Sequence, residues 1–461
     1  MSPSISFFAS ALTAIVLLSG VSHAEAEAAA VEFPATPPKV ELQDGDVFVF
    51  LGDSITHQAL YTQYIETYFL TRYPERDIRF HNAGVSGDRA ADALRRFQRD
   101  VAHYQPDHVS ILLGMNDAEY TSWKPTVFET YVANMSTLLD RLEETGAGVT
   151  LMHPTMFDAR AARRRGPVGE PTGSRYNGAL AYFGEWCRET AWQRGLGFAD
   201  LHAPLNRLTF DERRRDPLFT LVPDAVHPGP NGQLVMAVTM LEELFSRSRL
   251  VSNVTITRDQ DGKPSVTAPG ANVSAIEVGD DGSLLFEFQA ASLPWVVPDE
   301  AQLGYELTRA GHRLSGERFA AQELVPGEWE LLIDGTSVGQ WPHTRLARGI
   351  ELQENDQTPQ YQQALAVATA NAKRNSQHVK TLRDWWLQRK LRDFEIRKRK
   401  AEGAATPQQI AEIESAHEAW LSDAFTPGIE KAEAAATEDW EKLREMAQPK
   451  SHRYELRPVK D

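Results

Sequence analysis

Ser54 stands in the short stretch G-D-S-I-T, directly after a run of β-forming residues at Val47–Leu51. It can be a turn residue, the N-cap of a helix or a nucleophile. A serine hydroxyl is a weak nucleophile alone, so it needs a base, and the base needs a group that orients it. The stretch P-D-A-V-H-P offers both, because Asp224 and His227 stand three residues apart in a proline-bounded loop. This spacing lets the carboxylate hold one imidazole nitrogen while the other faces Ser54.

Two further stretches can supply hydrogen-bond donors for an oxyanion, which acyl transfer requires. In N-A-G-V-S-G-D, Gly87 has no side chain to block approach to its backbone N–H. In L-G-M-N-D, Asn116 offers a neutral amide N–H₂. The backbone N–H of Ser54 is a third donor. Each stretch alone is weak, because such turns occur by chance, but all four in order after the strands of one α/β unit are specific.

Structural interpretations remain open at each of these positions. They are a helix N-cap for Ser54, a turn glycine at Gly87, an Asx-turn residue at Asn116, a helix-start residue at Asp224 and a structural loop histidine at His227. No cluster of His, Asp and Glu has the spacing of metal ligands, so the sequence predicts no metal cofactor.

Strand and helix patterns alternate from residue 45 to about 249. The predicted strands are Val47–Leu51, Ile78–His81, His108–Leu113, Val149–His153 and Gly197–Asp200, and the predicted helices lie near 58–72, 88–103, 125–144, 175–195 and 231–248. Short apolar strands separated by helices predict a parallel sheet covered on both faces. Ligands of such sheets bind outside the C-terminal ends of the strands, where Ser54 follows the first strand.

The blocks G-D-S-I-T, N-A-G-V-S-G-D, G-M-N-D and D-A-V-H-P resemble the ordered motifs of the SGNH (GDSL-type) hydrolases over residues 45–249. The resemblance implies a flavodoxin-like three-layer α/β domain and ester hydrolysis without a metal. The roles that it implies are Ser54 as nucleophile, His227 as base, Asp224 as its carboxylate, and Gly87 and Asn116 as completing the oxyanion hole with Ser54. The family includes lipases, thioesterases, phospholipases and deacetylases of sugars and polysaccharides, so the substrate stays open.

Composition and charge restrict the class of protein. The 461 residues are 42% hydrophobic and 24% charged, which is ordinary globular composition, and this length predicts two or three domains. A formal net charge of −16 disfavours nucleic acid and anionic membranes as partners. Cys187 is the single cysteine of the sequence, so no internal disulfide can form. The sequence carries no indication of the oligomeric state.

The N-terminal residues have the pattern of a secretory signal. An apolar run from Phe7 to Leu18 precedes Ser22 and Ala24, an A-x-A-like cleavage site, although no Lys or Arg precedes the run. The alternative is a membrane anchor, but the run is short for a span, and no later segment is long and apolar enough to cross a bilayer. We predict a signal peptide at 1–24, a linker at 25–44, and a periplasmic or secreted protein.

The pattern changes beyond residue 249. Alternating residues and Asp-Gly turns predict a small antiparallel β-rich module at 250–348. Helical spacing predicts a C-terminal helical hairpin region at 349–461, in which Thr406 and Gln409 match a capping box. The β module is either a carbohydrate-binding addition or a cover for the sheet domain. We favour the cover, because the helices need an apolar surface against which to bury.

Two loops are candidates for substrate contacts. Tyr120 and Trp123 can form a platform for a sugar ring or pack in the core. Arg163 and Arg164 belong to a basic run that can attract an anionic substrate or be a solvated charge run. Together with export, these features favour an esterase that removes O-acyl groups, most simply O-acetyl, from a small-molecule or polysaccharide ester. The alternatives are a lipid or thioester hydrolase and a non-catalytic ester- or glycan-binding protein.

Overall fold

The computed structural model describes residues 35, 39–169, 172–245, 250–258, 263–403 and 405–459, which belong to one structural unit. The predicted signal peptide and most of the predicted linker lie outside these residues. Within the described ranges, no helix has both the length and the hydrophobicity that a membrane span needs.

A five-stranded parallel sheet carries the N-terminal half of the protein. Its strands are β1 (Val47–Gly52), β2 (Arg79–Gly84), β3 (His108–Leu112), β4 (Gly148–Met152) and β5 (Gly197–Ala199). Their spatial order is β2-β1-β3-β4-β5, and every neighbouring pair is parallel. The consecutive residues Phe48, Val49 and Phe50 are all buried, as expected for a strand with both faces covered.

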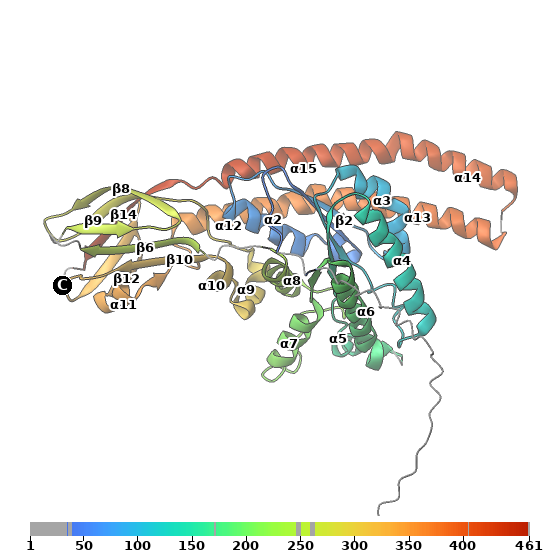
Figure 1. Ribbon diagram of the computed structural model, residues 1–461, viewed down its shortest axis with the longest axis horizontal. Coiled ribbons are helices and arrows are strands. Elements are labelled where there is room, and N and C mark those ends of the chain that lie inside the picture. Colours follow the sequence, from blue (N-terminus) through green and yellow to red (C-terminus); the bar gives the residue numbers. More distant parts are fainter. Residues whose placement is uncertain are drawn as a thin grey trace, which may run out of the picture. The chain divides into compact units, whose positions relative to one another are not determined.

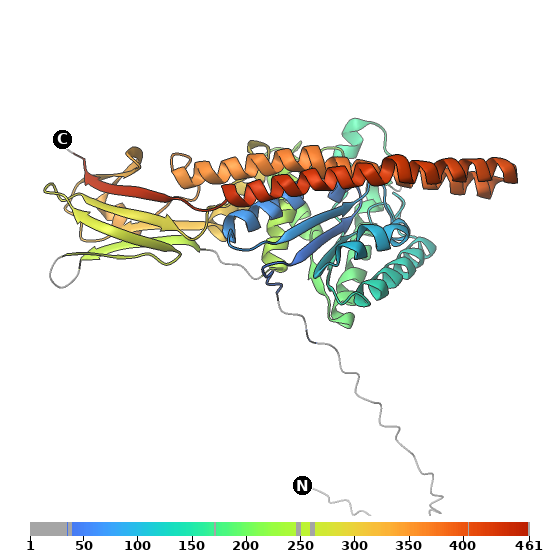
Figure 2. The same cartoon turned by 90° about the horizontal axis from the view of Figure 1, so that it is seen from above.

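Helices cover both faces of the sheet, which confirms the predicted α/β sandwich (Figure 2). They are α1 (Ser54–His57), α2 (Leu60–Arg72), α3 (Ala90–Asp100), α4 (Pro125–Glu143), α5 (Ala159–Arg165), α6 (Thr172–Arg194), α7 (His202–Glu212) and α8 (Pro230–Glu243), with a 3₁₀ turn at Ala102–Tyr104. Helix α2 joins β1 to β2 in one direction across the sheet, and α3, α4 and α6 join strands in the other direction. Because crossovers between parallel strands are right-handed, α2 lies on the opposite face of the sheet from α3, α4 and α6. Accordingly, α2 packs on α8, and α3 packs on α4.

The β-rich module consists of two sheets that share one core. Its elements are β6 (Leu250–Arg258), β7 (Pro264–Thr267), β8 (Ala271–Val278), β9 (Leu284–Ala290), β10 (Gly316–Ala321), β11 (Glu328–Ile333), β12 (Thr336–Pro342), β13 (Ile350–Glu351) and β14 (Ser451–Pro458), with α9 (Gln302–Thr308), α10 (Ala310–Leu314), α11 (His343–Arg348) and a 3₁₀ turn at Asp299–Ala301. The sheet orders are β13-β10-β6-β7 and β12-β11-β14-β9-β8. Val254 and Phe319 of the first sheet pack with Phe286, Leu331 and Tyr454 of the second.

Two features of this module differ from a simple antiparallel meander. Strands β6 and β10 pair in parallel, while the other pairs in the module are antiparallel. Strand β14 lies in the range where the sequence predicted helices, yet it pairs with β9 and β11 in the middle of its sheet. The module is therefore built from segments on both sides of the helical region.

Two long antiparallel helical segments form the C-terminal arm, residues 359–446 (Figure 1). Helix α12 (Pro359–Arg374) continues into α13 (Lys380–Glu402) through a π-helical turn at Asn375–Val379, and α14 (Pro407–Trp420) continues into α15 (Thr426–Met446) through another at Leu421–Phe425. The predicted capping box is confirmed: Gln409 N–H donates to Thr406 Oγ1, and Thr406 N–H donates to Gln409 Oε1 (2.8 Å).

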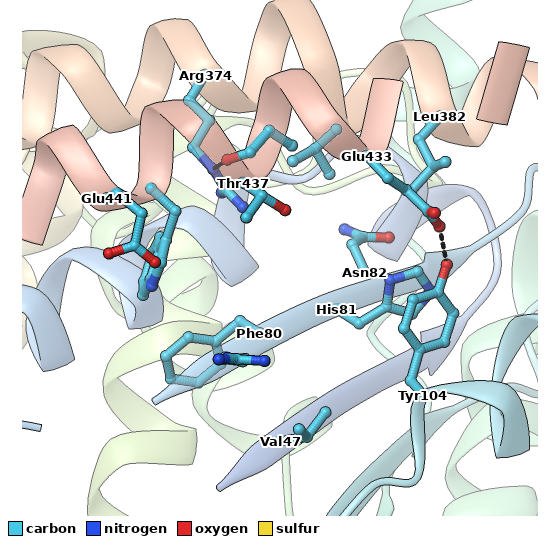
Figure 3. Close-up of a pocket in the computed structure, with 14 residues that line it drawn as sticks. Val47, Phe80, His81, Asn82, Tyr104, Arg374, Leu382, Glu433, Thr437 and Glu441 are labelled. Carbon is cyan, nitrogen blue, oxygen red and sulfur yellow. Dashed lines mark hydrogen bonds between the residues drawn. The ribbon is translucent and has the colours of Figure 1, made fainter. Parts of the chain in front are cut away.

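The arm lies along β2, the edge strand of the parallel sheet, and thus covers the edge that would otherwise be open to another strand. A cavity of about 360 Å³ remains between them (Figure 3). Phe80 and His81 of β2 line one side, and Arg374 and Trp440 of the arm line the other. The Tyr104 hydroxyl donates a hydrogen bond to the Glu433 carboxylate beside this cavity. None of the predicted catalytic residues lines it.

Buried charges join the arm to the α/β domain. Arg383 of α13 is 0% exposed and donates two hydrogen bonds to Asp100 at the end of α3, at 2.8 and 3.0 Å. Arg96 donates to the same carboxylate at 2.5 Å. Burial alone would raise the pKa of Asp100, but Arg383 and Arg96 outweigh it and hold that pKa below its ordinary value. The ion pairs therefore fix an ionised carboxylate under the arm.

We expect Arg383→Met to lower the free energy of unfolding by about 3–5 kcal/mol, because it leaves Asp100 buried with half of its cationic partners. Urea denaturation measures this loss. The matched control is Arg399→Met on the same helix, where an exposed pair with Glu395 (2.7 Å) is worth below about 1 kcal/mol. A loss in Arg383→Met no larger than in Arg399→Met would contradict the structural role of the pair.

Candidate active site

Ser54 lies at the C-terminal end of β1, where the connections between strands reverse their direction across the sheet. The connection from β1 runs back to β2, and the next one runs forward to β3, so the end of β1 is a topological switch point, where ligands of such sheets bind. Asp53 caps α1 by accepting the Ile55 N–H at 2.9 Å. Ser54 is the first helical residue, and its own N–H has no acceptor within the helix. The sequence thus folds Ser54 into the first turn of α1 at the end of β1, with its hydroxyl at hydrogen-bond distance from His227.

Ser54, His227 and Asp224 form a hydrogen-bonded chain. Ser54 Oγ lies 2.8 Å from His227 Nε2, and His227 Nδ1 lies 2.7 Å from Asp224 Oδ2. Asp224 also accepts the backbone N–H groups of His227 (2.7 Å) and Val226 (3.0 Å). Burial raises the pKa of Asp224, but these hydrogen bonds outweigh it and lower the pKa below its ordinary value.

The chain of contacts fixes the proton positions. An ionised Asp224 only accepts hydrogen bonds, so His227 Nδ1 carries the proton. His227 Nε2 is then free to accept the proton of the Ser54 hydroxyl. This is the arrangement that activates a serine nucleophile.

Gly87, in the loop after β2, has an unoccupied backbone donor. It has φ of +72°, which favours glycine. Its neighbours are engaged: Ser86 N–H donates to His57 Nδ1 (3.3 Å), and Asp88 N–H donates to Val85 O (3.1 Å). Among the described residues, no group accepts the Gly87 N–H. That N–H is available to a ligand, as an oxyanion donor must be.

Asn116 is held in one orientation by its neighbours. Its Nδ2 donates to Asp88 O at 3.0 Å and lies 3.4 Å from Asp53 Oδ2. Asp88 O can only accept, so it settles which end of the amide carries the N–H₂, and the Tyr120 hydroxyl donates to Asn116 Oδ1 at 3.3 Å. The contact to Asp53 is long, so one amide hydrogen of Asn116 is only weakly hydrogen-bonded.

The other predicted contact residues lie in different settings. Trp123 is 44% exposed and meets Tyr182, 50% exposed, edge-on at a ring distance of 5.4 Å. Arg163 donates to Gly173 O (2.6 Å), and Arg164 donates to Leu218 O (2.8 Å), so both guanidinium groups already have backbone acceptors. Substrate contacts by these residues, and by Tyr120, stay predictions.

Sequence reasoning missed His57, which is buried behind the site. Its Nδ1 accepts the Ser86 N–H, so its Nε2 carries the proton and donates to Asp384 Oδ1 of α13 at 3.0 Å. Burial lowers the pKa of His57 to about 4, which keeps the ring neutral. His57 stands three residues after Ser54, but nothing in the sequence indicates a partner 327 positions away.

Two buried carboxyl groups adjoin the site. Burial raises the pKa of Asp53 and the pKa of Asp117 to about 7 each. Asp117 accepts the Ala90 N–H through one oxygen at 2.9 Å, and its other oxygen has no hydrogen-bond partner. Across the described ranges, no three His, Cys, Asp or Glu side chains come together as metal ligands would.

Comparisons with known proteins show what this chain resembles. Residues 50–235 match the model of the GDSL-like lipase/acylhydrolase family. An acetylxylan esterase from Geobacillus stearothermophilus is 26% identical over 231 residues, which cover 44% of this chain and 96% of that protein. The solved structure of a gut microbial diltiazem-metabolizing enzyme is similar with a TM-score of 0.74 and 24% identity, over 91% of this chain and 99% of its own. Because this likeness covers 91% of the chain, the fold that the two proteins share includes the β module and the arm as well as the α/β domain.

Asp117→Asn tests the raised pKa. Between about pH 4, where the unfolded carboxyl titrates, and about pH 7, folded Asp117 binds a proton that the unfolded chain has lost. Its contribution to the free energy of unfolding therefore falls as pH rises. An asparagine keeps an acceptor for Ala90 N–H and stays neutral, so Asp117→Asn should gain stability over the wild type from about pH 5 to about pH 8.

Urea denaturation at both pH values measures this gain. The control is Asp211→Asn at an exposed position, which should show no comparable gain. A pH-independent difference between Asp117→Asn and the wild type would contradict a raised pKa.

Proposed function

Residues 50–235 belong to the GDSL-like lipase/acylhydrolase (SGNH) family, the protein is thus an ester-bond hydrolase, and we propose that it is an exported serine esterase that removes O-acyl groups from carbohydrates. O-acetyl is the simplest acyl group for this role. One observation carries the serine chemistry: the 2.8 Å contact between Ser54 Oγ and His227 Nε2, with Asp224 on the opposite imidazole nitrogen.

Acylation begins when Ser54 Oγ attacks the ester carbonyl carbon and His227 Nε2 takes the hydroxyl proton. Asp224 accepts the Nδ1–H and stabilises the imidazolium that forms. The oxyanion receives hydrogen bonds from the N–H groups of Ser54 and Gly87 and from the Asn116 amide. The imidazolium then protonates the alkoxide oxygen as its bond to the acyl carbon breaks. A sugar hydroxyl leaves, and the acyl group stays on Ser54.

Deacylation repeats these roles with water. His227 Nε2 removes a proton from water as the oxygen attacks the acyl carbon, and the same donors hold the second oxyanion. His227 returns the proton to Ser54 Oγ when the acyl–oxygen bond breaks. The products are a carboxylic acid, acetic acid for an acetyl ester, and the free enzyme.

Three observations support a carbohydrate as the alcohol part. The acetylxylan esterase relative is matched along 96% of its own length. Trp123 and Tyr182 expose aromatic faces, and sugar rings pack on such faces through their C–H groups. Because β1 and β3 are parallel, the segment with Trp123 leaves β3 at the same end of the sheet at which Ser54 follows β1. A substrate bound through its sugar would thus have rings to rest on at this end of the sheet.

The N-terminal sequence pattern supports export. The apolar run at Phe7–Leu18 and the small residues at Ser22 and Ala24 match a cleaved secretory signal. Acylated polysaccharides occur outside the cytoplasm, so an exported enzyme would meet them in the periplasm or the medium.

We expect a fluorophosphonate probe to label the wild type at Ser54 and to leave Ser54→Ala unlabelled. Hydrolysis of a chromogenic acetate by Ser54→Ala should fall by at least about 10⁴-fold, because only the oxyanion donors remain. Circular dichroism checks that the variant folds. A folded wild type that resists the probe would favour a non-catalytic ester- or glycan-binding protein.

Trp123→Ala tests the carbohydrate part. We expect KM for an acetylated xylo-oligosaccharide to rise about fivefold to tenfold, because a sugar ring loses its stacking face, while KM for a small chromogenic acetate stays unchanged. The matched control is Trp192→Ala, a 53% exposed tryptophan near the N-terminal end of β5, away from Ser54. Faster hydrolysis of long-chain acyl esters than of acetates would favour a lipid esterase instead.

A further inference from the structure

The loop that carries Gly87 is held by a helix that begins almost 300 residues later. Lys390 of α13 donates a hydrogen bond from Nζ to Ser86 O at 2.9 Å. The same ammonium group lies 2.9 Å from Asp88 Oδ1. A side-chain carbon added at Gly87 would lie 3.4 Å from Lys390 Nζ, so the ammonium rests directly against this residue.

The contact to Ser86 O bears on the oxyanion donor itself. Ser86 C=O and Gly87 N–H belong to one planar trans peptide, in which the two bonds point in opposite directions. A cation that fixes the carbonyl therefore fixes the direction of the N–H. It also draws electron density toward the carbonyl oxygen, which makes the N–H a stronger donor.

A second contact from α13 holds the preceding peptide. Asp384 accepts the Nε2–H of His57, and His57 Nδ1 accepts the Ser86 N–H. Lys380 Nζ also donates to both oxygens of Asp384, at 2.9 and 3.1 Å. The histidine is buried and neutral, so it relays the position of Asp384 to the loop without adding charge.

Apolar packing completes the attachment. Val85, fully buried at the start of the loop, packs with Trp386 of α13 and with Phe425 of the arm. The arm thus supplies an apolar contact at Val85, the hydrogen bond to Ser86 O and an ion pair at Asp88, and it holds the Ser86 N–H indirectly, through His57. Gly87 N–H is the group between them that no described residue accepts.

We propose that helix α13 is part of the catalytic apparatus. Lys390 positions and polarises the Ser86–Gly87 peptide so that the Gly87 N–H donates a hydrogen bond to the oxyanion, and Asp384 holds Ser86 through His57. Both residues are positioning residues. The inference rests on the proposed esterase function of the same site.

Charge compensation at Asp88 does not account for Lys390. Arg96 Nε already donates to Asp88 Oδ2 at 2.8 Å, so the carboxylate keeps a cation without the lysine. The contact of Lys390 with Ser86 O has no such substitute among the described residues. Because Arg96 still pairs with Asp88, a neutral residue at position 390 should not leave a buried, unpaired carboxylate.

Lys390→Met removes the ammonium and keeps most of the side-chain volume. We expect kcat for a chromogenic acetate to fall about tenfold to a hundredfold, because the oxyanion forms only in the transition state, and KM to change by less than about twofold. Lys390→Arg, which keeps a cation, should recover most of the rate. The matched control is Lys400→Met on the same helix, whose partner is Glu414, with kcat expected to equal that of the wild type.

A second measurement is independent of activity. In protein labelled with ¹⁵N-glycine, the Gly87 amide resonance is assigned by its absence in Gly87→Ala. We expect its proton shift to move upfield in Lys390→Met and to stay in place in Lys400→Met, because the peptide loses its polarising partner. Thermal unfolding midpoints show that each variant is folded. If Lys390→Met fails to fold, Asp384→Ala serves instead, with kcat expected to fall by about fivefold or more.

The outcomes separate the two proposals. Unchanged kcat and an unmoved Gly87 resonance in folded Lys390→Met would overturn the role of α13 and leave the esterase intact. A wild type that hydrolyses no ester and resists fluorophosphonate would overturn the proposed function. In that case the Gly87 resonance still decides whether Lys390 polarises the peptide.

Discussion

The hydrogen bond between Ser54 Oγ and His227 Nε2 requires the start of α1 and the loop before α8 to keep fixed positions relative to each other. Ser54 begins α1 after β1, and His227 precedes α8, 173 positions later. Helices α2 and α8 pack side by side, and buried Gln233 of α8 accepts the Tyr61 N–H at 3.0 Å and donates to Gln58. Gln233 thus joins α8, which follows His227, to α2 and to Gln58, the residue after α1.

The sequence was sufficient for those parts of the fold that local pattern determines. The five apolar strands, the capping box at Thr406, and the loops carrying Ser54, Gly87, Asn116 and His227 all lie where their spacing placed them. These features depend on residues within a few positions of one another or on the common edge of a parallel sheet. The chemical roles of the loop residues are predictions that await the labelling and kinetic measurements.

The features that the sequence could not give are pairings between distant segments. Asp384 with His57, Lys390 with Ser86, and Arg383 with Asp100 join residues that no periodicity relates, and on a helical wheel each looks like a solvated charge. Strand β14 was missed for a similar reason: eight residues after a long helical stretch carry a weak alternation, and only pairing with β9 and β11 makes them a central strand. A buried charged side chain also needs an oppositely charged partner, because losing that partner would leave an unpaired charge in the interior.

The position of β14 affects the order in which the molecule can assemble. Strands β8, β9, β11 and β12 emerge from the ribosome before the arm, but β9 and β11 become neighbours of one central strand only when the segment after the arm pairs between them. The arm is therefore a long insertion between β13 and β14, and both of these strands belong to the β module. The packing of the arm beside Gly87 is thus linked to completion of the β module. A nascent chain would already contain Ser54, Gly87 and His227, but it could not complete the sandwich that holds both ends of the arm until translation had passed β14.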